Sequence, residues 1–322
     1  MDTRINGPQS TDRMALTASA ALSRIRLRHL TCFVAVAQER TLARAAARLH
    51  LSQPAVSKTL AELEDLAGRR LVERGRAGTQ LTQAGEEFLR YAVDVTRALE
   101  SAAVVLTGAA VPIAPTVRVG ALPTVAGGLL ADALARLRER RPHAGVSVRI
   151  GDNLELLGWL KSGEIDLAVG RMAEPAMMQG AAFELLYAES LAVVTRPQHP
   201  LATAGDGVVS PRALLDYPLI VPGAGTAPRH DAEGFFAAHG VALPPGRTET
   251  QSAAVARALT LISDAVWITP QHPVQLDLDR RWLRRLNVPV PGNAEPVGIL
   301  SPSGVPVSEL TTQLMDTLRE LP

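Results

Sequence analysis

The chain has 322 residues, 47% of them hydrophobic, which is enough apolar material for two or three domains with cores of their own. This composition excludes a disordered protein. The formal net charge is only +1, but it is unevenly distributed, because residues 24–91 carry twelve Lys and Arg against seven Asp and Glu. The basic charge therefore lies in the first quarter of the chain, where a phosphate-binding module would need it.

Nothing in the sequence predicts a membrane span or an export signal. The longest apolar stretch, residues 102–114, is interrupted by Gly108 and Pro112 and falls short of the roughly 20 residues of a transmembrane helix. Residues 1–24 lack apolar periodicity and predict a disordered leader. Cys32 has no second cysteine to pair with, which fits a reducing compartment. We therefore expect a cytoplasmic protein that makes no contact with a membrane.

Residues 25–82 predict three helices joined by short turns. The first spans about residues 26–39, where apolar side chains recur at helical spacing. Thr41 and Ser52 are the expected N-caps of the second and third helices. Pro54 suits the first turn of the third helix, because proline has no N–H to leave unpaired there.

A hairpin is predicted after the third helix, because Gly75 and Gly78 interrupt the run of residues 70–82. Helices of this kind followed by a hairpin place one helix end in the major groove of DNA, while the hairpin contacts the backbone alongside. We therefore expect residues 25–82 to form a winged helix-turn-helix that binds double-stranded DNA. The candidate DNA-binding residues are Thr41, Ser52, Gln53, Pro54, Ser57, Lys58, Arg74 and Arg76.

The chemistry of these side chains suits DNA. Gln53 and Lys58 lie on the first turns of the third helix, where glutamine can read adenine and lysine can read guanine or hold phosphate. Arg74 and Arg76 in the hairpin suit phosphate or the minor groove. Any one of these residues could instead be a helix cap or a solvated charge, so their combination is what favours DNA binding.

A long helix is predicted over residues 83–110. Its apolar residues alternate spacings of four and three, a heptad pattern that implies a partner helix if this helix is isolated from any core, as we expect. The sequence therefore predicts dimerisation through this helix, and Pro112 and Pro115 mark the linker that follows it. The residues of the predicted dimerisation seam are Phe88, Ala92, Val95, Leu99, Ala102 and Leu106.

From residue 117 to 322, short apolar runs alternate with helical patterns, which predicts an α/β domain with mostly parallel sheets. We expect two lobes, one formed by residues 117–188 with 292–322 and the other by residues 189–291. The predicted strands are 117–121, 146–150, 165–169, 191–195, 219–221, 265–268 and 297–300. The predicted helices lie near 126–140, 153–162, 212–216, 229–239, 252–262 and 307–320.

A binding site for a small molecule is expected between the lobes, because ligands of such domains lie beyond the carboxyl ends of the strands. Thr124 follows the first strand, as a candidate N-cap beside an anion-attracting helix end. Arg171 follows the third strand and could grip a carboxylate with two hydrogen bonds, or pair with a neighbouring acid. The candidate effector-binding residues are Thr124, Asp152, Asn153, Arg171, Thr250, Ser252 and Thr269. Thr269 is expected to follow the strand predicted over residues 265–268, and Thr124, Thr250 and Ser252 could equally be helix caps.

Residues 27–85 resemble, without gaps, the DNA-binding module of LysR-type transcriptional regulators. The motifs that carry the resemblance are L-R-H-L-x-x-F-V-A-V-A, A-A-x-R-L-H-L-S-Q-P-A-V-S-K, L-E-x-L and L-x-E-R…L-T-Q-A-G. In the second half, V-R-V-G-A-L-P-T-V and L-K-S-G-E-I-D-L-A-V-G-R resemble the subgroup that controls protocatechuate and β-ketoadipate catabolic operons.

The resemblance implies a two-lobed effector domain similar to periplasmic binding proteins, homodimers that assemble into homotetramers, and contact with RNA polymerase. It also implies a small organic acid as effector, such as an intermediate of aromatic catabolism, held by the hydroxyl of Thr124 and the guanidinium of Arg171. No cofactor is implied.

Two other classes of function fit the sequence less well. A two-lobed domain could belong to a solute-binding receptor of a transporter, but the basic N-terminal module argues against this. An enzyme finds little support, because the sequence has no H-E-x-x-H, G-x-S-x-G or clustered metal-ligand spacing, so we predict no catalytic or metal-binding residues. Residues 223–226 lack the ending of a nucleotide-binding P-loop. Cys32, on the first helix, is expected to be a core residue and not a redox switch.

Overall fold

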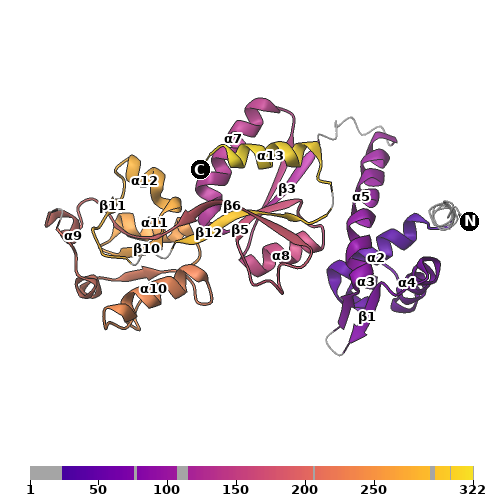
Figure 1. Cartoon of the computed structure of the whole chain (residues 1–322), viewed down its shortest axis with the longest axis horizontal. Helices are drawn as coiled ribbons and strands as arrows, with labels where there is room; N and C mark the ends of the chain where they lie inside the picture. Colours follow the sequence, from indigo (N-terminus) through magenta and orange to yellow (C-terminus); the bar gives the residue numbers. More distant parts are fainter. Residues whose placement is uncertain are drawn as a thin grey trace, which may run out of the picture. The chain divides into compact units, whose positions relative to one another are not determined.

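The computed structural model describes residues 24–75, 78–106, 115–205, 207–290, 294–304 and 306–321. The chain forms two compact units, one from the described residues up to 106 and the other from nearly all of those after 114 (Figure 1). Residues 1–23 of the expected leader, Arg76 and Pro112 lie outside the described residues. Within the described ranges, no helix is both long and apolar enough to cross a membrane.

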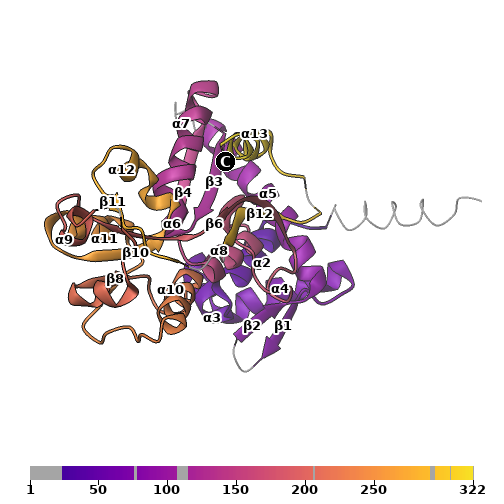
Figure 2. The same ribbon diagram turned by 60° about the vertical axis from the view of Figure 1, so that its left-hand side comes forward.

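The first unit begins with the predicted three helices and hairpin. The helices are α2 (Leu27–Glu39), α3 (Leu42–Leu49) and α4 (Gln53–Ala67), and the hairpin consists of β1 (Val72–Gly75) and β2 (Gly78–Leu81). The two expected N-caps are confirmed, because Thr41 Oγ1 accepts a hydrogen bond from the backbone N–H of Arg44, and Ser52 Oγ from that of Ala55, both at 3.3 Å. The hairpin extends from the helices as a wing (Figure 2).

The long helix α5 (Gln83–Leu106) takes part in the core of this unit along its first half. Phe88 lies with its ring centroid 5.3 Å from that of Phe33, and Ala92 is 1% exposed. The assumption that the heptad residues lie on a helix free of any core is therefore wrong for Phe88 and Ala92. Heptad spacing marks a face that some neighbour covers, and here α2 of the same chain covers its first turns. Further along α5, the exposed residues of the seam are Val95, Leu99, Ala102 and Leu106.

The wing is attached to the helices by a buried carboxylate. Glu64 on α4 is 7% exposed, and its Oε1 accepts hydrogen bonds from the backbone N–H groups of Leu71 and Val72 at 2.9 and 3.0 Å. Its Oε2 pairs with Arg70 at 3.1 Å. Glu64 therefore fixes the start of the wing relative to α4.

We predict that Glu64→Ala lowers the free energy of unfolding of the first unit by about 2–4 kcal/mol, because two buried N–H groups lose their acceptor. Urea denaturation followed by circular dichroism measures this loss. The neighbouring exposed variant Asp65→Ala is the matched control and should change stability by less than about 0.5 kcal/mol. Equal stability of the two variants would contradict the role given to Glu64.

The second unit contains two five-stranded sheets. The first has the strand order β4-β3-β5-β12-β6, in which β3 pairs in parallel with β4 and β5, and β12 is antiparallel to β5 and β6. These strands are β3 (Thr116–Ala121), β4 (Gly145–Ile150), β5 (Leu167–Arg171), β6 (Ala181–Glu189) and β12 (Glu295–Pro302). Helices α7 (Ala131–Arg140) and α13 (Glu309–Arg319) pack side by side (Figure 1, Figure 2). The helical segments α6 (Pro123–Val125) and η1 (Ala126–Leu130), a π-helix, precede α7, and α8 (Asn153–Lys161) follows β4.

The second sheet has the strand order β11-β7-β10-β8-β9, with β8 parallel to β9 and β10, and β7 antiparallel to β10 and β11. Its strands are β7 (Leu191–Thr195), β8 (Leu219–Val221), β9 (Thr248–Glu249), β10 (Val266–Pro270) and β11 (Arg284–Arg285). The helices of this part are α9 (Pro200–Thr203), η2 (Pro211–Asp216), α10 (Ala227–Ala238), α11 (Ala253–Ile262), η3 (His272–Val274) and α12 (Gln275–Asp279).

All seven predicted strands and the six predicted helical segments are present, with shifts of a few residues, but the expectation of mostly parallel sheets is wrong. Half of the strand pairings described above are antiparallel, because β7 and β12 run against their neighbours. The strand β6 went unpredicted because Glu184 interrupts its apolar residues, and all its residues before Glu189 are exposed or half-buried. In each of these mixed sheets some neighbouring strands remain parallel, β3 with β5 and β8 with β10. The carboxyl ends of these strands can therefore still serve as binding positions.

Candidate functional site

The start of α4 presents a polar surface to solvent. Ser52, Gln53, Pro54 and Lys58 are exposed there, as the sequence predicts for residues that face a DNA groove. Ser57 is half-buried and accepts a hydrogen bond from Nη2 of Arg74 in the wing at 2.8 Å. A hydrogen bond between two side chains therefore connects the wing to α4. Thr41 is half-buried as the cap of α3, and Arg76 lies outside the described residues.

Cys32 belongs to the core of this unit. Its side chain is 2% exposed and its thiol donates to the backbone carbonyl of Val56 at 3.4 Å. Burial raises the pKa of the thiol to about 11, so the reactive thiolate is scarce at neutral pH. This environment supports the interpretation of Cys32 as a packing residue.

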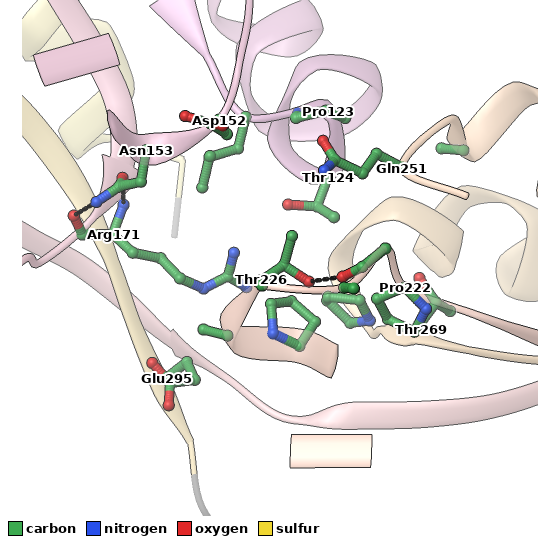
Figure 3. A pocket seen from close by; sticks show the side chains of 18 of the residues that line it. Pro123, Thr124, Asp152, Asn153, Arg171, Pro222, Thr226, Gln251, Thr269 and Glu295 are labelled. Atoms are coloured by element: carbon green, nitrogen blue, oxygen red, sulfur yellow. Dashed lines mark hydrogen bonds between the residues drawn. The ribbon is translucent and has the colours of Figure 1, made fainter. Parts of the chain in front are cut away.

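The second unit holds a cavity of about 400 Å³. It is lined by residues that follow β3, β4, β5 and β8 and by residues at the starts of α8, α10 and α11 (Figure 3). All the residues predicted for effector binding line it, namely Thr124, Asp152, Asn153, Arg171, Thr250, Ser252 and Thr269. The rule that ligands lie beyond strand ends thus brings together side chains that are up to 145 positions apart in the sequence.

Arg171 ends β5 and is held in place through its own backbone. The side-chain amide of Asn153 donates to the carbonyl of Arg171 and accepts from its N–H, both at 2.9 Å. Asn153 therefore clamps the first turn of α8 to the end of β5. The side chain of Arg171 is then directed into the pocket toward Thr226 (Figure 3).

The guanidinium of Arg171 is buried and only partly paired. Its Nη2 donates to Oε2 of Glu189 at 3.1 Å, and the two side chains are 9% and 2% exposed. The other oxygen of Glu189 accepts from the backbone N–H of His272 at 2.9 Å. Burial raises the pKa of the Glu189 carboxyl, opposed by the Arg171 charge and the His272 hydrogen bond. The ion pair that the sequence left open as an alternative is therefore present, yet Nε of Arg171 is buried with no hydrogen-bond partner.

Thr124 differs from its expected role as an N-cap. The helical segment begins at Pro123 with Leu122 as its cap residue, so Thr124 already lies inside the first turn. Its hydroxyl is buried and makes no hydrogen bond in the described structure. A buried polar atom without a partner is rare in folded proteins. Thr124 therefore brings a second unused hydrogen-bonding group to the same pocket.

The remaining predicted residues serve as caps or lie within a strand. Oδ1 of Asp152 accepts from the backbone N–H of Glu155 at 2.8 Å, and the backbone N–H of Asp152 donates to Oε2 of Glu155 at 2.9 Å, which makes a capping box for α8. Ser252 caps α11, and Thr250 Oγ1 accepts from the N–H of Ser252 at 3.0 Å. Thr269 lies in β10, 3% exposed, and does not follow that strand as expected.

Several lining residues were not predicted. Thr226 caps α10 and donates to the carbonyl of Gly223 at 2.8 Å, and Glu295 starts β12. The strand-end rule applied to β8 predicts Thr226, whereas the pattern of residues 223–226 predicted only the absence of a nucleotide-binding P-loop. An apolar group of lining residues also has no motif in the sequence: Leu154, Leu157, Met172, Met177 and Trp267.

The pocket lining combines three helix N-termini with polar and apolar side chains. Helices α8, α10 and α11 all begin at its lining, and helix N-termini favour anions. No cluster of three or more His, Cys, Asp or Glu side chains that could hold a metal ion occurs among the described residues. Small-molecule pockets of this size combine apolar walls with a few placed polar groups, as this one does.

Both halves of the chain match models of known protein families. Residues 27–86 match the model of the bacterial regulatory helix-turn-helix protein, lysR family, and residues 112–322 match that of the LysR substrate binding domain. The HTH-type transcriptional regulator YdcI of Escherichia coli strain K12 is 46% identical over 278 residues, covering 86% of this chain and 90% of that protein.

A second relative supports the narrower resemblance to the protocatechuate regulators. The HTH-type transcriptional regulator PcaQ of Agrobacterium fabrum is 38% identical over 297 residues, which cover 92% of this chain and 95% of that protein. The fold is also that of a full-length OxyR variant from Pseudomonas aeruginosa, at a TM-score of 0.60, 23% identity and coverage of 92% and 95%. The helix-turn-helix and substrate-binding matches, together with these relatives, place the chain in the LysR family of DNA-binding transcriptional regulators.

Proposed function

We propose that this regulator binds its operator through the start of α4 and the wing, and that a small organic acid in the pocket modulates this binding or the activation of transcription. The observation that carries the effector assignment is the pair of unused groups in one pocket, Nε of Arg171 and the hydroxyl of Thr124. Both can donate to a carboxylate, and a carboxylate would supply the acceptors that they lack.

The proposed DNA contacts are Gln53, Ser57 and Lys58 on α4 and Arg74 in the wing. Their position at the start of one helix, with the wing beside it, supports this proposal. The hydrogen bond between Arg74 and Ser57 implies that the two act together when DNA is bound. Thr41 and Ser52 contribute by capping their helices, which aims the helix ends at phosphate groups.

The proposed working form is a homodimer, joined further into a homotetramer. The exposed apolar side chains of α5, among them Val95, Leu99 and Leu106, support a dimer contact along the second half of that helix.

A ligand in the pocket can then shift the arrangement of the DNA-binding modules only as far as it binds one arrangement more tightly than another. The proposal also includes contact with RNA polymerase and a ligand from aromatic catabolism. The similarity to PcaQ supports both.

The DNA proposal predicts that Lys58→Ala weakens operator binding and lowers the slope of log K against log salt by about one unit, because one phosphate contact is lost. Fluorescence anisotropy at several salt concentrations measures both. Arg138→Ala, an exposed arginine of α7 in the second unit, removes the same charge and should leave the slope unchanged. An unchanged slope for Lys58→Ala would refute the contact.

The dimer proposal predicts that Leu99→Asp shifts the protein toward monomers at micromolar concentration, since a charge would have to be buried in the helix contact. Light scattering with size-exclusion chromatography measures the mass. Val208→Asp, at a residue that is 72% exposed in the second unit, is the control for an added surface charge. If both variants keep the mass of the wild-type protein, α5 does not supply the dimer contact.

The same light-scattering measurement tests the tetramer. A wild-type protein that stays a stable dimer, both free and on DNA, would overturn the tetramer.

The effector proposal predicts that Thr124→Val leaves thermal stability unchanged or slightly higher, because it removes a buried hydroxyl that has no partner. The affinity for an aromatic acid, with benzoate and 3,4-dihydroxybenzoate as probes, should fall about five- to tenfold as one hydrogen bond is lost. Calorimetric titration measures this. Thr203→Val, whose hydroxyl bonds only to backbone carbonyls of α9 and its cap, should bind the acids normally. Equal affinities in the two variants would remove Thr124 from the site.

A further inference from the structure

The helical segment that carries Thr124 contains a π-turn. The π-helix η1 follows α6 directly, and the regular helix α7 begins only after it. Two consecutive glycines, Gly127 and Gly128, lie in η1. Glycine is unfavourable inside a helix because it loses more backbone freedom than other residues, and π-turns are frequent at functional sites. A neighbour that leaves no room for a side chain would explain a glycine in such a turn.

The ring of His272 is such a neighbour for Gly128. A Cβ atom on Gly128 would lie 2.9 Å from Cδ2 of His272 and 3.3 Å from its Nε2. The first of these contacts is too short for a real Cβ atom, so the ring and η1 would have to move apart. A Cβ atom on Gly127 would meet no atom within 4 Å outside its own helical segment. Of these two glycines, only Gly128 is therefore constrained by His272.

His272 is held in place by an aromatic neighbour. The ring of Tyr187 in β6 stacks on that of His272, with the centroids 4.8 Å apart and the planes inclined by 24°. Burial lowers the pKa of His272, opposed by the charge of Asp132 on α7, so the imidazole is mostly neutral at pH 7. A neutral ring that is stacked in this way acts on Gly128 through its shape.

The backbone of His272 supports the other side of the effector site. Its N–H donates to Oε1 of Glu189, and Oε2 of Glu189 accepts from Nη2 of Arg171. Both α6 and η1 also contact η3, the segment that His272 begins. His272 thus touches the support of Arg171 through its N–H and the segment that carries Thr124 through its ring.

We propose that His272 is a positioning residue of the effector site, which sets the placement of the Thr124 hydroxyl relative to Nε of Arg171. This inference rests on the proposed function, in which these two groups bind one carboxylate. Both line the pocket, whereas His272 is not among the described residues that do so (Figure 3). Hydrogen bonds weaken steeply when their geometry departs from the optimum, so a displaced α6 would lose the contact of Thr124 with the acid.

The first test adds the same methyl group at each of the two neighbouring glycines. Titration calorimetry on the full-length protein, with benzoate and 3,4-dihydroxybenzoate as probes, measures the affinity for the acid. Gly128→Ala should lower this affinity at least about fivefold, because the methyl group pushes η1 away from His272. Gly127→Ala is the matched control and should stay within about twofold of the wild-type protein.

A second test asks whether the ring of His272 is the cause. His272→Ala removes the ring but keeps the N–H that holds Glu189, and should lower the affinity about threefold or more. In this background the added methyl group of Gly128→Ala has no ring to meet. It should then change the affinity by less than about twofold, as expected for two residues that act through one contact.

A third test separates positioning from a general loss of stability. Thr124→Val should cost about five- to tenfold in affinity in the wild-type protein, but about twofold or less in the Gly128→Ala background. The reason is that a displaced Thr124 has already lost its contact with the acid. A methyl group that only destabilises the fold would leave the cost of Thr124→Val unchanged.

Four results would overturn the inference. Equal affinities of Gly127→Ala and Gly128→Ala, both with native circular dichroism spectra, would remove the contact with His272 from the site. A full effect of Gly128→Ala in the His272→Ala background would show that the methyl group acts elsewhere. An unchanged cost of Thr124→Val in the Gly128→Ala background would refute the coupling and leave Thr124 as a ligand of the acid. If the wild-type protein binds neither acid at millimolar concentration, the assignment of an acid effector fails, and this inference fails with it.

Discussion

The buried ion pair between Arg171 and Glu189 is the interaction on which the effector half of this regulator depends. Removal of one member of a buried ion pair is strongly destabilising, because it leaves a buried charge without its partner. Here Asn153 fixes the backbone of the arginine, and the N–H of His272 fixes the glutamate. Because both side chains are already held in place, little conformational entropy of Arg171 and Glu189 is lost when a ligand binds. The pair leaves Nε of Arg171 buried and without a hydrogen-bond partner, and a desolvated guanidinium donor binds a carboxylate strongly.

Both units use the same device of a buried glutamate that organises backbone N–H groups next to a functional surface. In the first unit, Glu64 holds the first residues of the wing against α4, and thereby sets the position from which Arg74 reaches Ser57. In the second, Glu189 ties the end of β6 to His272 at the start of η3. In each case the charged group is structural, and the side chains beside it are those proposed to meet DNA or effector.

Much of this arrangement could be predicted from the sequence, because the signals are local. Thr41 and Ser52 identify helix starts, and the rule for strand ends found Arg171, whose partner could not be found in the same way. Glu189 ends a half-exposed edge strand whose apolar residues are interrupted by Glu184, and only the sheet register brings it beside Arg171 and Glu295. The role of Thr124 was misjudged because the cap lies two residues earlier, at Leu122. Phe88 and Ala92 show that heptad spacing does not tell whether a partner helix or the chain's own core covers a face.

The central claim is that one carboxylate of the effector completes the unused donors of Arg171 and Thr124 while the pair with Glu189 stays intact. A crystal structure of the full-length protein with a bound monocarboxylic acid tests it most directly. The account predicts a carboxylate oxygen within hydrogen-bond distance of both Nε of Arg171 and the hydroxyl of Thr124, with Glu189 still bonded to Nη2. An acid bound elsewhere, or an arginine that leaves Glu189 to reach the ligand, would contradict it.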